Sequence, residues 1–366
     1  PSVRPELAAL PVAVTLRPYA DGDLAGAWLV HACTDDPAVN AAVAAEAERR
    51  QVPCVRADAA PGGTARTPAV ARAGGLVVAV ASADAAEPDP GRVRAVRDAV
   101  ALLLDTGGLP LRPQRPGPGR VALVGGGPGD PELITVRGRR LLAEADVVVV
   151  DRLAPRVLLD ELPPGVEVVD VGKAPHGSGP TQERISALLV DRARRGLRVV
   201  RLKGGDPFVL GRGGEEVLAC VAAGVPVEVV AGVSSVLAGP AAAGIPVTHR
   251  GVAADFAVVS GHLDPTRPGS TVDWQALADG PGTVVLLMGL DRLAAVAAEL
   301  VKRGRPAGTP VAVVRRATLP DQQVLVGTLD TIAGQVTAAG LRPPAVVVIG
   351  DVVGLRDTLW GGAPPG

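Results

Sequence analysis

Short runs of β-branched residues alternate with segments of helical periodicity along most of this chain. From residue 120 onward the runs are apolar throughout, which is typical of parallel strands covered by helices on both faces. The pattern predicts an α/β fold with parallel or mixed sheets in two lobes. The predicted strands are Val121–Val124, Val147–Val150, Val166–Val171, Val199–Leu202 and Val227–Val230, then Phe256–Ser260, Thr283–Met288, Val311–Val314, Gln323–Val326 and Ala345–Ile349. The predicted helices are Pro131–Ala145, Thr181–Arg195, Gly214–Ala223, Asp291–Arg303 and Leu329–Ala339.

The first hundred residues show the same alternation. We predict a strand at Ala27–Ala32, a helix at Pro37–Arg50, a short strand at Pro53–Ala57 and a strand at Leu76–Ala81. This order indicates a parallel α/β sheet. A Pro- and Gly-rich stretch follows and is typical of a linker. The predicted organisation is a module at 1–104, a linker at 105–119 and two lobes at 120–240 and 241–366.

Composition narrows the classes of function. The 366 residues are 47% apolar and carry a net charge of −1, which argues against broad electrostatic binding to nucleic acid or to an anionic membrane. A Pro, Glu or Asp interrupts every apolar run that is long enough to span a bilayer. The three cysteines lie far apart, with neither zinc-type spacing nor a disulfide framework, so we expect a reducing cytoplasm and no metal centre.

Rare residues gather in the loops that follow the predicted strands. Only three of the 37 lysines and arginines are lysines, and two of them, Lys173 and Lys203, directly follow strands. Because ligands bind beyond the carboxyl ends of parallel strands, these loops predict one binding site. In strand order the loops are Gly125–Asp130, Asp151–Arg152, Gly172–Lys173, Lys203–Pro207 and Ala231–Ser235.

The glycine loop after the first of these strands is not a nucleotide-phosphate loop. The dinucleotide fingerprint would need glycine where Asp130 stands, and Pro128 and Pro131 remove backbone donors. We expect Asp130 to cap the helix that follows it. Such a loop still allows the backbone to approach a flat or uncharged ligand closely.

Two residues of opposite charge suit proton transfer. Asp151 and Lys173 could face each other across the cleft as proton acceptor and proton donor, or they could form a salt bridge. Asp206 could bind a ribose hydroxyl or only close its turn, and we expect Lys203 to be structural. Each histidine, His176 among them, is expected to be an ordinary hydrogen-bonding residue, and no H-E-x-x-H or G-x-S-x-G motif supports a hydrolase.

Several motifs in a fixed order resemble one family. They are VALVGGGPGD at Val121–Asp130, DVVVVDRL at Asp146–Leu153, VVRLKGGDPF at Val199–Phe208, GRGGEE at Gly211–Glu216 and GIPVTHR at Gly244–Arg250. From about Val121 to Trp360 the chain resembles the uroporphyrinogen-III C-methyltransferases of the tetrapyrrole methylase family. The resemblance implies a two-lobed, homodimeric methylase that uses S-adenosylmethionine and releases S-adenosylhomocysteine. It also implies that uroporphyrinogen III is methylated at two ring carbons to precorrin-2, for siroheme or cobalamin synthesis.

The resemblance implies residue roles as well. Asp151 would accept protons and Lys173 would donate them. The donor pocket would be lined by Pro128, Gly204, Gly205, Asp206, Val209, Ser234, Ser235, Met288 and Ala317. Because the substrate carries many carboxylates, four arginines are expected as its anchors, namely Arg152, Arg201, Arg212 and Arg250. The chain departs from the family pattern at Ala174, where arginine is usual, and at Ala317, where glycine is expected.

The first hundred residues resemble part of the Rossmann-like N-terminal module of bifunctional siroheme synthases. The likeness rests on Ala32–Asn40, on Thr67–Pro68 and on Asp58, which matches that module's catalytic acid. In those enzymes the module oxidises precorrin-2 with NAD and inserts iron. The opening strand and the glycine-rich NAD loop are absent here, so we expect a dimerising remnant without NAD-dependent activity. The alternatives are a methylase of a later corrin, a bifunctional synthase that retains oxidation and iron chelation, and a non-catalytic tetrapyrrole-binding module.

Overall fold

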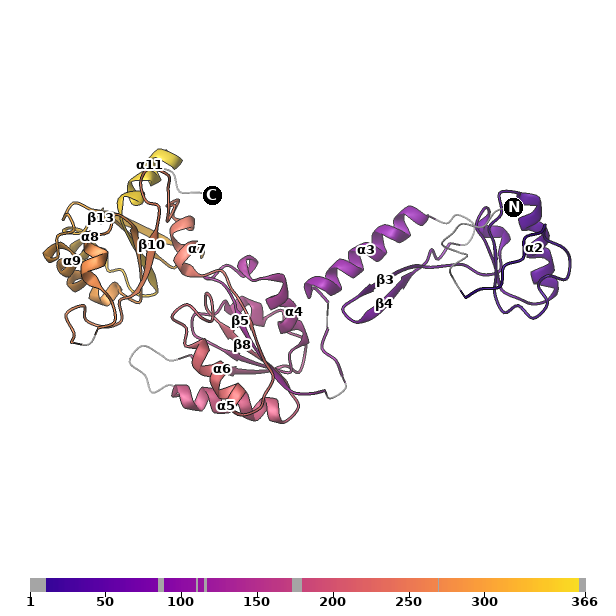
Figure 1. The fold of residues 1–366 in the computed structure, drawn as a ribbon, viewed down its shortest axis with the longest axis horizontal. Coiled ribbons are helices and arrows are strands. Elements are labelled where there is room, and N and C mark those ends of the chain that lie inside the picture. The colour runs from indigo at the N-terminus through magenta and orange to yellow at the C-terminus, as the bar shows by residue number, and fades with distance from the viewer. Residues whose placement is uncertain are drawn as a thin grey trace. The chain divides into compact units, whose positions relative to one another are not determined.

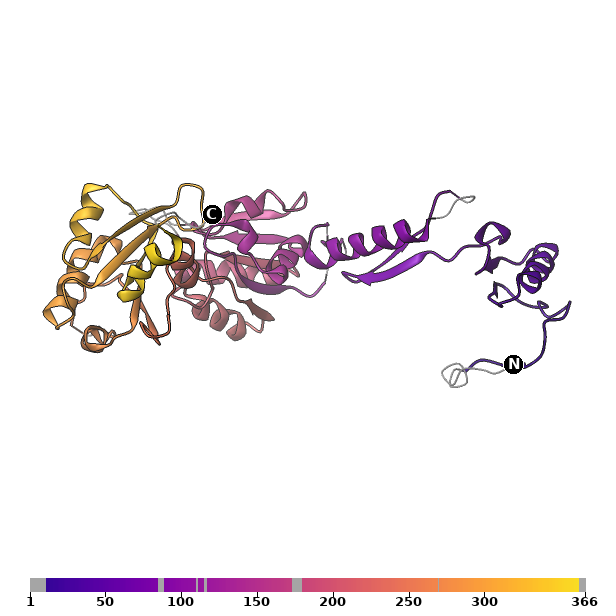
Figure 2. The same cartoon turned by 90° about the horizontal axis from the view of Figure 1, so that it is seen from above.

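The computed structural model of the chain describes residues 11–84, 89–109, 111–114, 117–172, 180–268 and 270–361. The chain divides into two compact units, residues 1–105 and residues 106–366. Figures 1 and 2 show the elements of each unit in two views.

The first unit begins with a small parallel sheet. Strands β1 (Val30–Ala32) and β2 (Cys54–Arg56) pair in parallel and are connected by helix α2 (Pro37–Arg49). Asp36 caps α2, because its carboxylate accepts a hydrogen bond from the backbone N–H of Ala38. This strand–helix–strand unit confirms the elements predicted for this stretch and agrees with a Rossmann-like module.

A hairpin and a long helix complete the first unit, and here the sequence expectation was wrong. Strand β4 (Leu76–Val80) was expected in the parallel sheet, but it pairs antiparallel with β3 (Ala69–Ala73). Gly74 and Gly75 close this hairpin, and both have a positive φ, a conformation that glycine adopts without strain. Helix α3 (Pro90–Thr106), which follows, was not predicted, and neither was the short 3₁₀ turn Ala60–Gly62.

The first lobe of the second unit is a doubly wound parallel sheet (Figure 1). Its strand order is β7-β6-β8-β5-β9, and every neighbouring pair is parallel. The strands are β5 (Arg120–Gly125), β6 (Val147–Val150), β7 (Glu167–Asp170), β8 (Arg198–Lys203) and β9 (Val227–Val230). The helices are α4 (Val136–Glu144), α5 (Gln182–Arg194) and α6 (Gly213–Ala222), with 3₁₀ turns at Pro131–Leu133 and Arg156–Leu159. Helix α7 (Ser235–Ala242) follows β9 and packs on the second lobe, where Val236 lies in one cluster with Val285 and Val346.

Side-chain alternation along these strands explains why both faces of the sheet are apolar. Val148 and Val150 of β6 lie in a buried core with α4, whereas Val147 and Val149 lie in a second core with α5 and α6. All four valines are buried. The unbroken apolar runs therefore form strands covered on both faces, as predicted from the sequence.

The second lobe holds a mixed sheet in the order β10-β11-β14-β12-β13. Only β10 and β11 are parallel neighbours, and the other pairs are antiparallel. The strands are β10 (Phe256–Ser260), β11 (Thr283–Leu287), β12 (Pro310–Arg315), β13 (Gln323–Thr328) and β14 (Ala345–Ile349). The helices are α8 (Trp274–Asp279), α9 (Leu293–Lys302), α10 (Ile332–Ala338) and α11 (Leu355–Trp360), with 3₁₀ turns at Leu290–Arg292 and Asp351–Gly354. Helices α8 and α11 were not predicted, because six residues are too few to show a helical period.

The two lobes are joined by a polar contact as well as by the chain. The backbone N–H of Asp130, in the glycine loop, donates to the hydroxyl of Thr318 at 3.1 Å. Within the second lobe, the amide of Gln322 donates to the carbonyl of Ala242 at 2.9 Å. The loop after β12 is thereby held against both the glycine loop and the end of α7.

Candidate functional site

The loops after β5, β8 and β9 meet at the carboxyl edge of the first sheet. Gly127 and Gly205 form an antiparallel bridge, in which the Gly205 N–H donates to the Gly127 carbonyl at 2.7 Å. A Cβ on Gly125 would lie 2.5 Å from Gly232 Cα, so these two backbones can approach only as glycines. Three loops predicted as one site are therefore in direct contact.

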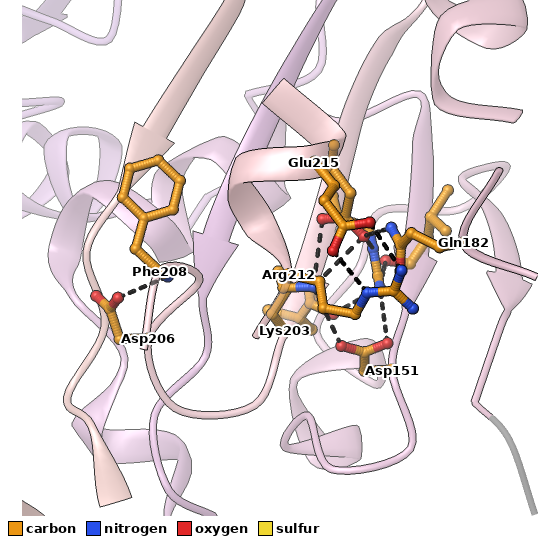
Figure 3. A network of polar contacts seen from close by, with 11 residues as sticks. Asp151, Gln182, Lys203, Asp206, Phe208, Arg212 and Glu215 are labelled. Atoms are coloured by element: carbon orange, nitrogen blue, oxygen red, sulfur yellow. Dashed lines mark hydrogen bonds and ion pairs between the residues drawn. The ribbon is translucent and has the colours of Figure 1, made fainter. Parts of the chain in front are cut away.

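Gly204 and Asp206 shape the turn after β8. A Cβ on Gly204 would lie 2.6 Å from the carbonyl oxygen of Leu153, in the loop after β6. Asp206 accepts hydrogen bonds from the N–H groups of Phe208 at 2.8 Å and Gly232 at 3.0 Å (Figure 3). Its carboxylate therefore closes the turn and ties it to the β9 loop, which was one of the two roles expected from sequence.

The remaining residues expected around a donor pocket come from both lobes. Ser234 is the N-cap of α7 and accepts a hydrogen bond from the Val236 N–H at 3.3 Å. Met288 follows β11, is half exposed and has a positive φ of 56°. The other members are partly or fully buried, namely Pro128, Gly205, Val209, Ser235 and Ala317. Asp130 caps the 3₁₀ turn behind the glycine loop, as predicted, by accepting from the Glu132 N–H.

Asp151 lies at the end of β6 beside the β8 loop. Its N–H donates to the Leu202 carbonyl at 3.1 Å, so the backbone continues the strand pairing by one residue. Its carboxylate accepts a hydrogen bond from Arg201 Nη2 at 2.5 Å, and Lys203 Nζ lies 3.7 Å from the second oxygen. With 30% of its side chain exposed, Asp151 is the acid of this cluster that is open to solvent.

A buried charge network contacts Asp151 (Figure 3). Arg201, Lys203 and Glu216 are each less than 5% exposed. Glu216 of α6 pairs with Arg201 Nε at 2.9 Å and with Lys203 Nζ at 3.2 Å, and Gln182 of α5 donates to it at 3.2 Å. The sequence reasoning did not single out Glu216 or Gln182. A signal existed for Glu216, because it lies four residues before the buried Cys220 on one helix face.

Lys173 and His176 lie outside the described residues, so the expected Asp151–Lys173 pair stays a prediction. The loop that carries them begins beside Asp151. A Cβ on Gly172 would lie 2.8 Å from the backbone nitrogen of Arg152. The chain therefore enters this segment next to the Asp151–Arg152 loop.

The four arginines expected as substrate anchors differ in their surroundings. Arg152 and Arg250 are exposed. Arg212 is also exposed and forms an ion pair with Glu215 at 2.7 Å. Arg201 is buried, and its nitrogens are engaged by Glu216, by Asp151 and by backbone carbonyls. A direct contact with substrate therefore suits the three exposed arginines, whereas Arg201 contacts the carboxyl edge of the sheet only through Asp151.

Asp58, the acid singled out in the first unit, follows β2. It forms an ion pair with Arg56 at 2.6 Å, and its side chain is 21% exposed. The hydrogen bond from Arg56 lowers the pKa of Asp58, so the group is held as a carboxylate. In that state Asp58 can act as a proton acceptor.

The part of the chain that the structure describes holds neither a metal-binding cluster nor a membrane-spanning helix. Within it, no group of three or more His, Cys, Asp or Glu side chains is arranged to hold a metal ion. No helix of that part is long and apolar enough to cross a membrane. Its three cysteines carry free thiols, with Cys54 and Cys220 buried and Cys33 exposed.

Comparison with family models gives two matches. Residues 120–333 match the model described as Tetrapyrrole (Corrin/Porphyrin) Methylases, which is more than half of the chain. Residues 3–69 match the model described as Putative NAD(P)-binding. The first match spans both lobes, and the second spans β1, α2 and β2 of the first unit.

Individual relatives agree with these matches. An S-adenosyl-L-methionine-dependent uroporphyrinogen III methyltransferase of Methanosarcina barkeri is 48% identical over 241 residues, or 66% of this chain and 94% of that protein. A siroheme synthase of Ectopseudomonas mendocina is 36% identical over 413 residues, covering 98% of this chain and 89% of that protein. The chain spans about half, 55%, of a siroheme synthase of Methylococcus capsulatus, with 44% identity over 72% of this chain.

A solved structure resembles the second unit. It is the crystal structure of uroporphyrin-III C-methyl transferase from Thermus thermophilus complexed with S-adenyl homocysteine. The TM-score is 0.55 with 46% sequence identity, and the match covers 64% of this chain and 93% of that one.

Proposed function

Because this chain belongs to the tetrapyrrole methylase family, we propose that it is an S-adenosylmethionine-dependent methyltransferase that converts uroporphyrinogen III to precorrin-2. The observation that carries the proposal is Asp151, a partly exposed carboxylate at the carboxyl edge of the first sheet, where the glycine loops meet. The relatives named above as uroporphyrinogen III methyltransferases support this substrate.

The residues around the cleft fit the methyl donor. Gly127, Gly204 and Gly205 present backbone without side chains, and a Cβ at Gly204 would collide with Leu153. A flat adenosine can lie against such a surface, and Ser234 at the start of α7 offers a hydroxyl. We assign the donor pocket to these residues together with Pro128, Asp206, Val209, Ser235, Met288 and Ala317.

S-adenosylmethionine, when bound, supplies an electrophilic methyl group on a sulfonium, which an electron-rich pyrrole carbon can accept. Each transfer leaves one proton to be removed from the macrocycle. We assign this role to Asp151, whose carboxylate accepts a hydrogen bond from Arg201 and is partly exposed. Lys173 completes the proposal as the proton donor. Holding the reacting carbon near the methyl supplies much of the rate.

The exposed arginines around the cleft would hold the substrate's carboxylates. Arg152 adjoins Asp151, and Arg212 and Arg250 follow β8 and α7 in the same unit. A guanidinium binds a carboxylate through two parallel hydrogen bonds, so these side chains would fix the macrocycle's orientation. Arg201 is assigned to Asp151 instead, because it is only 2% exposed.

The first unit carries a second candidate function. The siroheme synthase relative that covers 98% of this chain favours NAD-dependent precorrin-2 oxidation followed by iron insertion. We propose that this unit serves dimerisation instead. Saturable binding of NAD to the full chain with a micromolar dissociation constant would favour the oxidase over the remnant.

We also propose that the enzyme is a homodimer that works in the cytoplasm. The free thiols of Cys33, Cys54 and Cys220 suit a reducing compartment.

The test is methyl transfer from labelled S-adenosylmethionine to uroporphyrinogen III. Two methyl groups per substrate are expected, with precorrin-2 identified by its absorbance and mass. Transfer only to a later corrin would favour the other methylases of the family. Binding of tetrapyrrole with no transfer to either acceptor would indicate a non-catalytic module.

A further inference from the structure

Two Asp–Arg pairs join the same two strands at their opposite ends. Asp146 directly precedes β6 and Asp151 directly follows it, while Arg198 begins β8 and Arg201 lies near its end. Arg198 binds Asp146 at 2.7 and 2.8 Å at the amino edge, away from the cleft. Arg201 binds Asp151 at the carboxyl edge, where the loops of the proposed site meet.

The guanidinium of Arg201 is held from several directions. Its Nε donates to Glu216 at 2.9 Å, and its Nη1 lies 3.3 Å from the Val149 carbonyl and 3.4 Å from the Leu202 carbonyl. Only Nη2 points to Asp151, at 2.5 Å. A planar group held by three contacts at two of its nitrogens directs the third nitrogen to one point, so the Asp151 oxygen has a defined position.

Charge balance ties Glu216 to the same task. The network holds two cations, Arg201 and Lys203, and two anions, Asp151 and Glu216. Glu216 is 0% exposed and contacts both cations, so it balances one of the two buried positive charges and leaves the other to Asp151. Because buried ion pairs add little net stability over apolar residues, this cluster is better explained by the position it imposes.

We propose that Arg201 is the positioning residue for Asp151 and that Glu216 positions Arg201 in turn. Their function is to hold the Asp151 carboxylate at the rim of the cleft in one orientation. This inference rests on the proposed role of Asp151 as proton acceptor. The two arginines of β8 thus have different functions, with Arg198 serving stability alone.

The test is a double-mutant cycle on methyl transfer to uroporphyrinogen III by the full chain. Arg201→Met is expected to lower kcat between about 10- and 100-fold, the cost of a misplaced acceptor. The KM for S-adenosylmethionine and the dissociation constant of S-adenosylhomocysteine are expected to stay within about 2-fold. In an Asp151→Asn background the same substitution is expected to change kcat by less than about 2-fold, because its target is gone.

Arg198→Met is the matched control. This substitution removes an arginine of β8 together with its ion pair to Asp146, which flanks β6. The pair lies at the amino edge of the sheet, opposite to Asp151. We expect a lower unfolding temperature and an unchanged kcat. If Arg201→Met prevents folding, Glu216→Gln takes its place, since it keeps the shape and weakens the hold on Arg201. A kcat loss of about 3- to 10-fold is then expected, again absent in the Asp151→Asn background.

The outcomes separate the two hypotheses. If Arg201→Met lowers kcat equally with and without Asp151, the role of Arg201 is merely structural and the inference is overturned. The inference is also overturned if Arg201→Met leaves kcat unchanged. Absence of transfer by the wild-type chain would instead reject the proposed substrate. Unchanged activity of Asp151→Asn alone would reject the proton acceptor and the positioning role with it.

Discussion

The hydroxyl of Thr318 in the second lobe accepts a hydrogen bond from the backbone N–H of Asp130 in the first lobe, at 3.1 Å. Thr318 holds a positive φ of 68°, which is uncommon for a β-branched residue and costs on the order of 1–3 kcal/mol. Next to it, Leu319 packs so closely on Gly129 that a Cβ there would lie 2.9 Å from Leu319 Cγ. A strained loop of one lobe therefore fixes the glycine loop of the other.

Replacing Thr318 with Ala should weaken donor binding more than it weakens the fold. The lost hydrogen bond is worth about 1 kcal/mol, whereas alanine relieves some strain at positive φ, so we expect little net change in unfolding free energy. The dissociation constant of S-adenosylhomocysteine should rise about 5-fold, because 1 kcal/mol corresponds to that factor. Calorimetric titration measures it.

Thr337→Ala is the matched control for that experiment. Thr337 donates to the Ala333 carbonyl within α10, on an exposed surface. Its loss should leave ligand affinity unchanged. Equal affinities for wild type and Thr318→Ala would show that the interlobe bond does not shape the donor pocket.

Gly204→Ala should abolish transfer. The added Cβ would lie 2.6 Å from the Leu153 carbonyl oxygen, so the loops after β6 and β8 must separate. We expect kcat/KM to fall more than about 100-fold, since a shift near 1 Å at a reacting site has that effect. Gly214→Ala is the control, because nothing lies within 4 Å of its Cβ and it is the second residue of α6. That variant should be as active as wild type and as stable or more so, and loss of activity in both would point to a cause other than the collision with Leu153.

The strands of the second unit could be predicted, and the charge network could not be predicted in full. An unbroken valine run marks β6 to the residue, since a parallel strand covered on both faces favours apolar residues at every position. Arg201 was expected to be a substrate anchor because the substrate implied by the resemblance carries many carboxylates. Alternation with Val199 would have placed it on the helix-covered face. Its partner Glu216 comes from a helix packed on that face, and such pairing depends on tertiary structure.

The first unit illustrates a different limit. The hairpin of β3 and β4 was misjudged because a strand's direction is set by its turn, and the Gly74–Gly75 turn was not weighed. Helix α3 carries arginines and two aspartates among its apolar residues, so its period was less visible than that of helices packed on a sheet.

Asp146 should make stability fall in acid. Burial alone would raise its pKa, but hydrogen bonds from the Arg198 side chain and N–H, and from Arg112, lower the pKa to about 2 from the ordinary 3.8. A lowered pKa means that the stabilisation is complete above about pH 4 and is lost as the pH falls toward 2. At neutral pH, Asp146→Asn should cost about 2 kcal/mol of unfolding free energy.

Denaturant unfolding of both proteins from pH 7 to pH 2 measures this difference. The fluorescence of Trp274, which is 4% exposed, reports the second unit. The gap between wild type and Asp146→Asn should narrow across pH 4 to 2. A gap that stays constant over that range would contradict the role assigned to the carboxylate.

Tyr19 should titrate at unusually high pH. It is the only tyrosine of the chain, and its hydroxyl donates to the carboxylate of Glu46, which is 1% exposed. Burial, the hydrogen bond and the charge of Glu46 raise the pKa of Tyr19 to about 12 from the ordinary 10.0. Since the folded pKa is the higher one, the stabilisation is complete below about pH 10 and is lost as the pH rises through 12.

Tyrosinate absorbance in the near ultraviolet follows this single group, with a midpoint near 12 expected. Glu46→Gln should move the midpoint toward 10, and Glu48→Gln, an exposed change on the same helix, should leave it unchanged. A wild-type midpoint near 10 would mean that Tyr19 and Glu46 are not joined in the folded first unit.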